Sequence, residues 1–198
     1  MEAFKISIKL YAERDGFGPS DFVPVFQHWI QTQALPDHLL IDVADYAHVP
    51  DGPGTVLVTS QANLYTDRGD GRLGLLYSRK LPLEGTFFDR LRQVTAAALA
   101  AAALLEKEEK LGGRLKFRAD ELLIRINDRL LAPNTAETLA AVAPDIERLG
   151  KMLYGNATYR IDFKPSALKL FEVSVKAQQG PTFQAMAERL KPATSASK

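Results

Sequence analysis

Short segments in which apolar and polar residues alternate are the feature that most constrains this fold. Residues 4–11 place Phe4, Ile6, Ile8 and Leu10 on one side of an extended chain and Lys5, Ser7, Lys9 and Tyr11 on the other. Residues 159–163 and 171–175 repeat this period of two. Such strands have one buried face and one wet face, which is typical of antiparallel sheets rather than doubly wound parallel ones. The pattern predicts an α+β protein with a mainly antiparallel sheet backed by helices.

Further strands are expected between these segments. Residues 39–46 form a nearly continuous apolar run, which predicts a strand buried on both faces. Residues 55–63 and 73–80 flank the turn-forming sequence Asp-Arg-Gly-Asp-Gly, so we expect them to pair as an antiparallel hairpin. Residues 115–118 and 122–126 predict two more strands.

Apolar residues at helical spacing predict two helices in the first half of the chain. One is capped by Ser20 or Asp21, and its apolar stripe comprises Phe22, Val25, Phe26, Trp29 and Ile30. The other is rich in alanine and runs from Phe87 to about Lys110, before the stop at Gly112 and Gly113. We expect this second helix to lie tightly across the sheet.

The second half of the chain predicts helices from Thr135 and over residues 182–191. Asn134 and Glu137 have the spacing of a capping box for the first of these. Pro144 is expected to interrupt this helix and to start a second helical segment over residues 145–154.

Both halves of the chain follow the order strand, helix, strands, helix, with a boundary near Gly112. We therefore expect one α+β domain over residues 1–191, with residues 1–112 and 113–191 as possible subdomains. No repeat is recognisable at the level of single residues. Residues 192–198, Pro-Ala-Thr-Ser-Ala-Ser-Lys, predict a disordered tail.

The composition excludes several kinds of chemistry. The chain has no cysteine and only three histidines, which removes thiolate nucleophiles, iron–sulfur clusters and cysteine-based zinc sites. With 25 basic and 24 acidic residues, no global field favours nucleic acid. The longest apolar run, residues 96–105, is about half of what a bilayer-spanning helix needs. With no signal-peptide pattern at the start, we expect a cytoplasmic protein without a cofactor, metal, nucleic-acid partner or membrane contact.

The densest group of chemically active side chains lies in residues 42–51, which contain no basic residue. Asp42, Asp45, His48 and Asp51 recur every three residues, but in a strand that enters a loop such side chains diverge, so a metal site is not expected. Asp42, Asp45 and His48 are candidates for acid–base work. Asp45, Tyr46, His48 and Asp51 are candidates for ligand binding.

A second candidate cluster surrounds the predicted hairpin and includes Asn63, Arg72, Tyr77 and Arg79. The two arginines can each hold a carboxylate or phosphate, and the tyrosine offers a hydroxyl or a stacking face. The glycines in Gly69-Asp-Gly-Arg-Leu-Gly74 match a dinucleotide fingerprint in letters only. A strand rather than a helix is expected to follow them, so nucleotide binding is not predicted.

Four stretches, residues 22–31, 39–46, 71–80 and 131–135, resemble bacterial proteins of an uncharacterised family. They read Phe-Val-Pro-Val-Phe-Gln-His-Trp-Ile-Gln, Leu-Leu-Ile-Asp-Val-Ala-Asp-Tyr, Gly-Arg-Leu-Gly-Leu-Leu-Tyr-Ser-Arg-Lys and Leu-Ala-Pro-Asn-Thr. The resemblance covers most of the chain and implies a bacterial protein. It implies no activity, cofactor or catalytic residue.

These observations favour a non-enzymatic module that binds a protein partner or a small ligand through residues 42–51 and 63–80. One alternative is a hydrolase or transferase in which Asp42, Asp45 and His48 move protons while Arg72 or Arg79 holds an anionic substrate. This alternative requires the two clusters to converge. Another is a self-assembling structural protein, a homo-oligomer built through the alanine-rich helix and exposed sheet edges.

Overall fold

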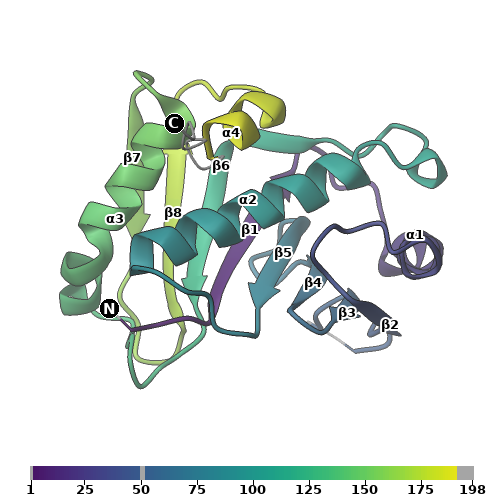
Figure 1. The fold of residues 1–198 in the computed structure, drawn as a ribbon, viewed down its shortest axis with the longest axis horizontal. Helices are drawn as coiled ribbons and strands as arrows, with labels where there is room; N and C mark the ends of the chain where they lie inside the picture. The colour runs from purple at the N-terminus through teal and green to yellow at the C-terminus, as the bar shows by residue number, and fades with distance from the viewer. Residues whose placement is uncertain (1, 50–51, 191–198) are drawn as a thin grey trace, which may run out of the picture.

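The computed structural model describes residues 2–49 and 52–190 and contains one antiparallel sheet covered by helices (Figure 1). The strand order across the sheet is β2-β3-β4-β5-β1-β6-β8-β7, and all neighbouring strands are antiparallel. Both halves of the chain contribute, because β6 pairs with β1 at the centre. The predicted α+β class is confirmed.

The strands are β1 (Ile6–Ala12), β2 (Leu40–Asp45), β3 (Thr55–Thr59), β4 (Ala62–Asp67), β5 (Gly74–Arg79), β6 (Phe117–Ile126), β7 (Tyr159–Phe163) and β8 (Phe171–Ala177). The helices are α1 (Pro19–Thr32), α2 (Phe87–Leu105), α3 (Ala136–Tyr154) and α4 (Phe183–Leu190), with a 3₁₀ turn, η1 (Glu109–Leu111).

One face of the sheet packs against the helices and forms the core. Ile6, Ile8 and Leu10 of β1 are fully buried there, as is Trp29 of α1. Helix α1 lies on β2 and β3, α2 crosses β1 and β5, and α3 lies against β7 and β8 (Figure 1). Helix α4 packs on α2 and α3. The alanine-rich α2 thus lies across the sheet as predicted, because its small side chains allow close approach.

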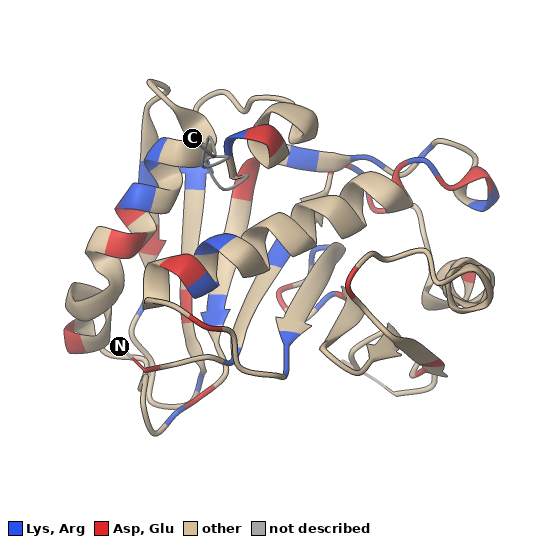
Figure 2. Ribbon diagram, in the orientation of Figure 1, with Lys and Arg blue, Asp and Glu red and all other residues tan. Residues whose placement is uncertain are grey.

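The opposite face of the sheet carries polar and charged side chains between apolar ones. Lys9 on β1 lies opposite Leu76 on β5 and Leu123 on β6, so the three side chains point away from the helices. Charged residues of both signs also occur along β6 and β8 (Figure 2). We call this the open face.

Two strand predictions were wrong, one in the burial of the strand and one in its bounds. Residues 39–46 do not form a strand buried on both faces: β2 is an edge strand, and Leu39 and Ile41 are more than half exposed. The predicted strand over residues 55–63 is instead β3, a tight turn and the start of β4, and β4 is the partner of β5. The Thr59 hydroxyl closes this turn by accepting from the Ala62 N–H and donating to its carbonyl.

Residues 117–126 also differ from the prediction, because they form a single strand rather than two. Its length lets β6 bridge the two halves, pairing with β1 on one side and β8 on the other.

The helix ends and the effect of Pro144 also differ from the predictions. Helix α3 is continuous through Pro144. Proline has no N–H to donate to the carbonyl of Ala140, but both residues lie on the exposed side of the helix, where water can bind that carbonyl. Helix α2 ends at Leu105, not near Lys110, because the following segment makes other contacts: Glu108 accepts a hydrogen bond from the Trp29 indole at 2.5 Å.

The caps of α1 and α3 lie one or more residues away from the predicted ones. Gly18 is the N-cap of α1, and its N–H is held by the Asp21 carboxylate. Thr135, not Asn134, caps α3, because the Asn134 amide instead donates to the Lys164 carbonyl. The predicted tail, residues 192–198, lies outside the described residues.

Candidate functional site

The acidic segment predicted as a contact surface lies on the exposed edge strand β2 and the turn after it. Asp42 accepts a hydrogen bond from the Val43 N–H at 2.8 Å, and Asp45 accepts one from the Ala47 N–H at 2.9 Å. Tyr46 and His48 stack on each other with ring centroids 6.4 Å apart. Asp51 lies outside the described residues. Both carboxylates thus bond to local backbone and do not converge on a shared centre.

The residues predicted around the hairpin are divided between the two faces of the sheet. Asn63 on β4 lies on the open face, where its amide donates to the Tyr65 hydroxyl. Arg72 precedes β5 and lies on the same face, whereas Tyr77 and Arg79 point to the helix side. Arg72 lies two residues before β5 and Arg79 is its last residue, so the two are near opposite ends of a strand whose six residues span about 20 Å.

The acidic segment and the two arginines therefore do not assemble into one site. Strand β2, which carries Asp42 and Asp45, is separated from β5 by β3 and β4, a distance of about 14 Å between strands. Arg72 is engaged by Glu121, and Arg79 donates to the Leu81 carbonyl.

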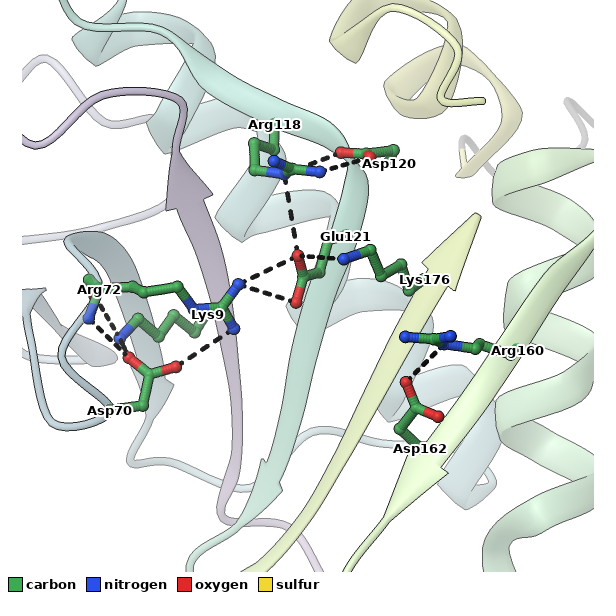
Figure 3. A network of polar contacts seen from close by, with 9 residues as sticks. All are labelled: Lys9, Asp70, Arg72, Arg118, Asp120, Glu121, Arg160, Asp162 and Lys176. Atoms are coloured by element: carbon green, nitrogen blue, oxygen red, sulfur yellow. Dashed lines mark hydrogen bonds and ion pairs between the residues drawn. The ribbon is translucent and has the colours of Figure 1, made fainter. Parts of the chain in front are cut away.

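The open face instead carries a network of ion pairs that the sequence did not single out (Figure 3). Lys9 is 1% exposed, and its ammonium lies 2.6 Å from Asp67 Oδ2 and 2.6 Å from Asp70 Oδ1. The Arg72 guanidinium lies 3.7 Å from the centre of the Tyr11 ring and donates to both oxygens of Glu121 at 3.0 and 3.1 Å. Alternation with Ile8 and Leu10 places Lys9 and Tyr11 on this face.

Glu121 joins the two ends of this network. Besides Arg72, it lies 3.8 Å from Arg118 and 3.6 Å from Lys176, and Arg118 also pairs with Asp120 at 2.7 Å (Figure 3). The network therefore contains four cations and four carboxylates, and its formal charges cancel. The cations are Lys9, Arg72, Arg118 and Lys176; the carboxylates are Asp67, Asp70, Asp120 and Glu121.

The resolved pKa shifts indicate that this network holds its charges fixed. Burial raises the pKa of Tyr11, and the neighbouring Asp70 carboxylate raises it further. Burial opposes the charged form of Asp70, but hydrogen bonds from Lys9, Tyr11 and the Arg72 backbone outweigh it and lower the pKa of Asp70. Both shifts move the pKa of the group further from pH 7, whereas acid–base catalysts work best with a pKa near the working pH.

A different site lies on the helix side, where a hollow of about 550 Å³ opens between α2, α4 and the loop before β2. Its wall is mostly apolar and includes Leu35, Leu83, Val94, Ala97 and Leu190. Its polar groups are Asp37, His38, Tyr77, Arg79, Arg92 and Gln93. Two residues predicted for ligand binding, Tyr77 and Arg79, thus line this hollow together with His38, which was not among the predicted site residues.

The polar side of the hollow is organised by a hydrogen bond between the buried Tyr77 and the half-buried His38. The two side chains are 2.7 Å apart, and Tyr77 is 1% exposed. His38 Nδ1 lies 2.8 Å from the Pro36 carbonyl, which can only accept, so Nδ1 carries the proton. In the tautomer with the proton on Nδ1, Nε2 accepts from the Tyr77 hydroxyl. Burial raises the pKa of Tyr77 despite the nearby Arg79.

Two arginines of the hollow have no carboxylate partner among residues 2–49 and 52–190. Arg79 Nε donates to the Leu81 carbonyl at 3.0 Å, and Arg92 donates to the Leu190 carbonyl at 2.7 Å. No salt bridge involves either side chain within the described ranges. This differs from the open face, where Arg72, Arg118 and Arg125 each pair with a carboxylate.

No protein-family model matches this chain, and neither the comparison with curated proteins nor that with solved structures found a match. Within the described part of the chain, no three histidine or acidic side chains are placed to hold a metal ion together. None of the helices described is long and apolar enough to cross a bilayer.

Proposed function

We propose that this protein is a non-enzymatic binding module whose small ligand occupies the hollow between α2, α4 and the loop before β2. The observation that supports this most directly is the hollow itself, which has a volume of about 550 Å³, a mostly apolar wall and a hydrogen-bonded Tyr77–His38 pair in its lining. Small-molecule sites are commonly 300–1,000 Å³ clefts with apolar walls and a few converging polar groups.

The side chains that line the hollow favour binding over catalysis. Among the described residues, the lining contains no serine, threonine or lysine that an adjacent base could activate as a nucleophile. The raised pKa of Tyr77 keeps its hydroxyl protonated at neutral pH, and this hydroxyl already donates a hydrogen bond to Nε2 of His38. The Tyr77–His38 pair is therefore suited to hold a polar group of a ligand rather than to transfer a proton.

The space in the hollow depends on small side chains of α2, which allows a direct test. Ala97 is half-buried and lines the hollow, whereas Ala103 is half-buried on the same helix and does not. We would titrate the wild-type protein with N-phenyl-1-naphthylamine, a neutral apolar fluorophore whose emission rises in apolar sites. Binding is expected in the wild type and in Ala103→Phe, and is expected to be lost in Ala97→Phe because the ring fills the hollow.

Binding of a protein partner is a second candidate function, supported by the exposed apolar side chains of residues 39–49. Eight large apolar side chains are exposed among the described residues, and four of them are Leu39, Ile41, Tyr46 and Val49. Clustered exposed apolar side chains are typical of contact surfaces. A pull-down with Ile41→Asp as the matched negative control tests this second function independently of the hollow.

A further inference from the structure

The two arginines of the hollow are the observation that identifies a class of ligand. Each donates to one backbone carbonyl, and neither forms a salt bridge within residues 2–49 and 52–190. A guanidinium group has five N–H donors, so most donors of Arg79 and Arg92 remain to be satisfied by water or by a ligand. We infer that the ligand of the hollow is an amphipathic anion, whose carboxylate or phosphate head is held by Arg79 and Arg92 while its apolar body lies along α2.

The acidic groups near these arginines do not replace such a ligand. Asp37 lines the hollow but forms no salt bridge in the described structure. Asp89 precedes Arg92 by one turn of α2, and the charge of Arg92 contributes to lowering the pKa of Asp89. The Asp89 carboxylate nevertheless accepts hydrogen bonds from the Thr86 N–H and hydroxyl at the start of α2. Asp89 does not line the hollow, and the side chains that do include two arginines and one carboxylate, Asp37. The lining therefore carries one net positive charge.

The apolar part of the lining suits a hydrocarbon chain or an aromatic ring rather than a fully polar anion. It includes Ala96, Ala97 and Ala100 of α2 and Leu190 of α4. A small inorganic anion would leave this apolar surface in water. An amphipathic anion covers it and gains roughly 25 cal/mol for each Å² of apolar area buried.

The open face offers a contrast that supports this assignment. A depression of about 450 Å³ there contains Lys9, Arg72 and Arg125, each of which already contacts a carboxylate, and also Lys169, which forms no salt bridge within the described residues. An anion bound by one of those three cations would have to compete with Asp70, Glu121 or Glu172. Neither arginine of the hollow has such a competitor in a salt bridge within the described residues.

This inference rests on the proposed function. Ligands with the same alkyl chain but different head groups test the two claims separately. Displacement of bound N-phenyl-1-naphthylamine would be measured with octanoate, octyl phosphate and the neutral octanol. We expect octanoate or octyl phosphate to displace the probe at a concentration at least tenfold lower than octanol, because charge-assisted hydrogen bonds are the stronger ones. The better of the two anions identifies the head group.

The arginines are tested with Arg79→Gln/Arg92→Gln, and Arg160→Gln on the exposed edge strand β7 is the matched control. The double variant is expected to bind the neutral probe as the wild type does but to lose the preference for the anions; the control should keep it. Equal displacement by octanol and the anions in the wild type would overturn the anionic class while leaving the hollow as a binding site. Absence of probe binding would overturn both.

Discussion

The ammonium of Lys9 lies 2.6 Å from Oδ1 of Asp70, although the two residues are 61 positions apart in the chain. The same ammonium donates to the Arg72 carbonyl at 2.9 Å, so one buried lysine holds the whole turn between β4 and β5. Because Lys9 belongs to the central strand, this turn is fixed to the middle of the sheet. The loop geometry of the open face depends on this contact.

Replacing Lys9 with methionine should destabilise the protein by about 3–5 kcal/mol, because Asp67 and Asp70 would keep their charges without the cation. Urea unfolding measures the difference. Lys164→Met, at an exposed lysine, is the control and should change the free energy of unfolding by less than about 0.5 kcal/mol. A loss below about 1 kcal/mol in Lys9→Met would show that water replaces the ammonium adequately.

Asp70 should contribute to the loss of stability in acid. Its pKa is lowered in the folded protein and is near its ordinary value of 3.8 in the unfolded chain, so its contribution is complete above that value. As the pH falls below about 3.8 the unfolded chain takes up the proton first, and the contribution disappears as the pH passes through the folded pKa. Asp70→Asn should therefore flatten the decline of stability below pH 4, measured by urea unfolding across pH 2–7. An unchanged slope would contradict this.

Gly54 and Gly71 should differ in their tolerance of alanine although both have positive φ angles. A Cβ on Gly54 would lie 2.3 Å from the Thr66 carbonyl oxygen, whereas a Cβ on Gly71 would meet nothing within 4 Å. Gly71→Ala is expected to cost about 1–2 kcal/mol, for the left-handed conformation alone. Gly54→Ala should cost clearly more, since backbone must move. Thermal unfolding of both variants checks this, and equal losses would refute it.

Asp42 should limit self-association through the edge strand β2. The Val43 N–H points away from β3 and donates a hydrogen bond to the Asp42 carboxylate instead. Asp42→Ala frees this donor on an exposed apolar strand, which favours pairing with another strand edge. Sedimentation velocity should show association at lower protein concentration than in the wild type. Asp45→Ala, whose carboxylate serves the following turn instead, is the control, and equal behaviour of all three proteins would count against the role of Asp42.

The spacing of apolar residues along the chain predicted most helices and strands, because it reflects which side of each helix or strand is buried. Ile6, Ile8 and Leu10 and the stripe around Trp29 are buried as their spacing requires. The errors arose where a long-range neighbour decides the outcome. Residues 39–46 are apolar enough for a central strand, but β2 lies at the sheet edge. Pro144 does not end α3, because side chains on both sides of it, including Val142 and Ile146, are buried in the core and stabilise the helix.

For the candidate site, residue type alone led to the prediction that Arg72, Tyr77 and Arg79 bind a ligand together. The structure separates them, because Arg72 lies on the open face of the sheet and the other two point to the helix side. Lys9 and Tyr11 were interpreted only as the wet side of a strand, although charged residues facing away from the core on a central strand are a usable signal. Arg92 could not be found, since nothing local distinguishes it from other helix arginines.

Hydrophobic periodicity was enough to predict the alternation of strands and helices and the buried side of most of them, because it depends on residues only a few positions apart. The pairing of β6 with β1, the contact of Lys9 with Asp70 and the placement of Arg79 and Arg92 at one hollow follow from the three-dimensional fold. Such meetings depend on strand order and register, which bring together side chains that no local pattern relates.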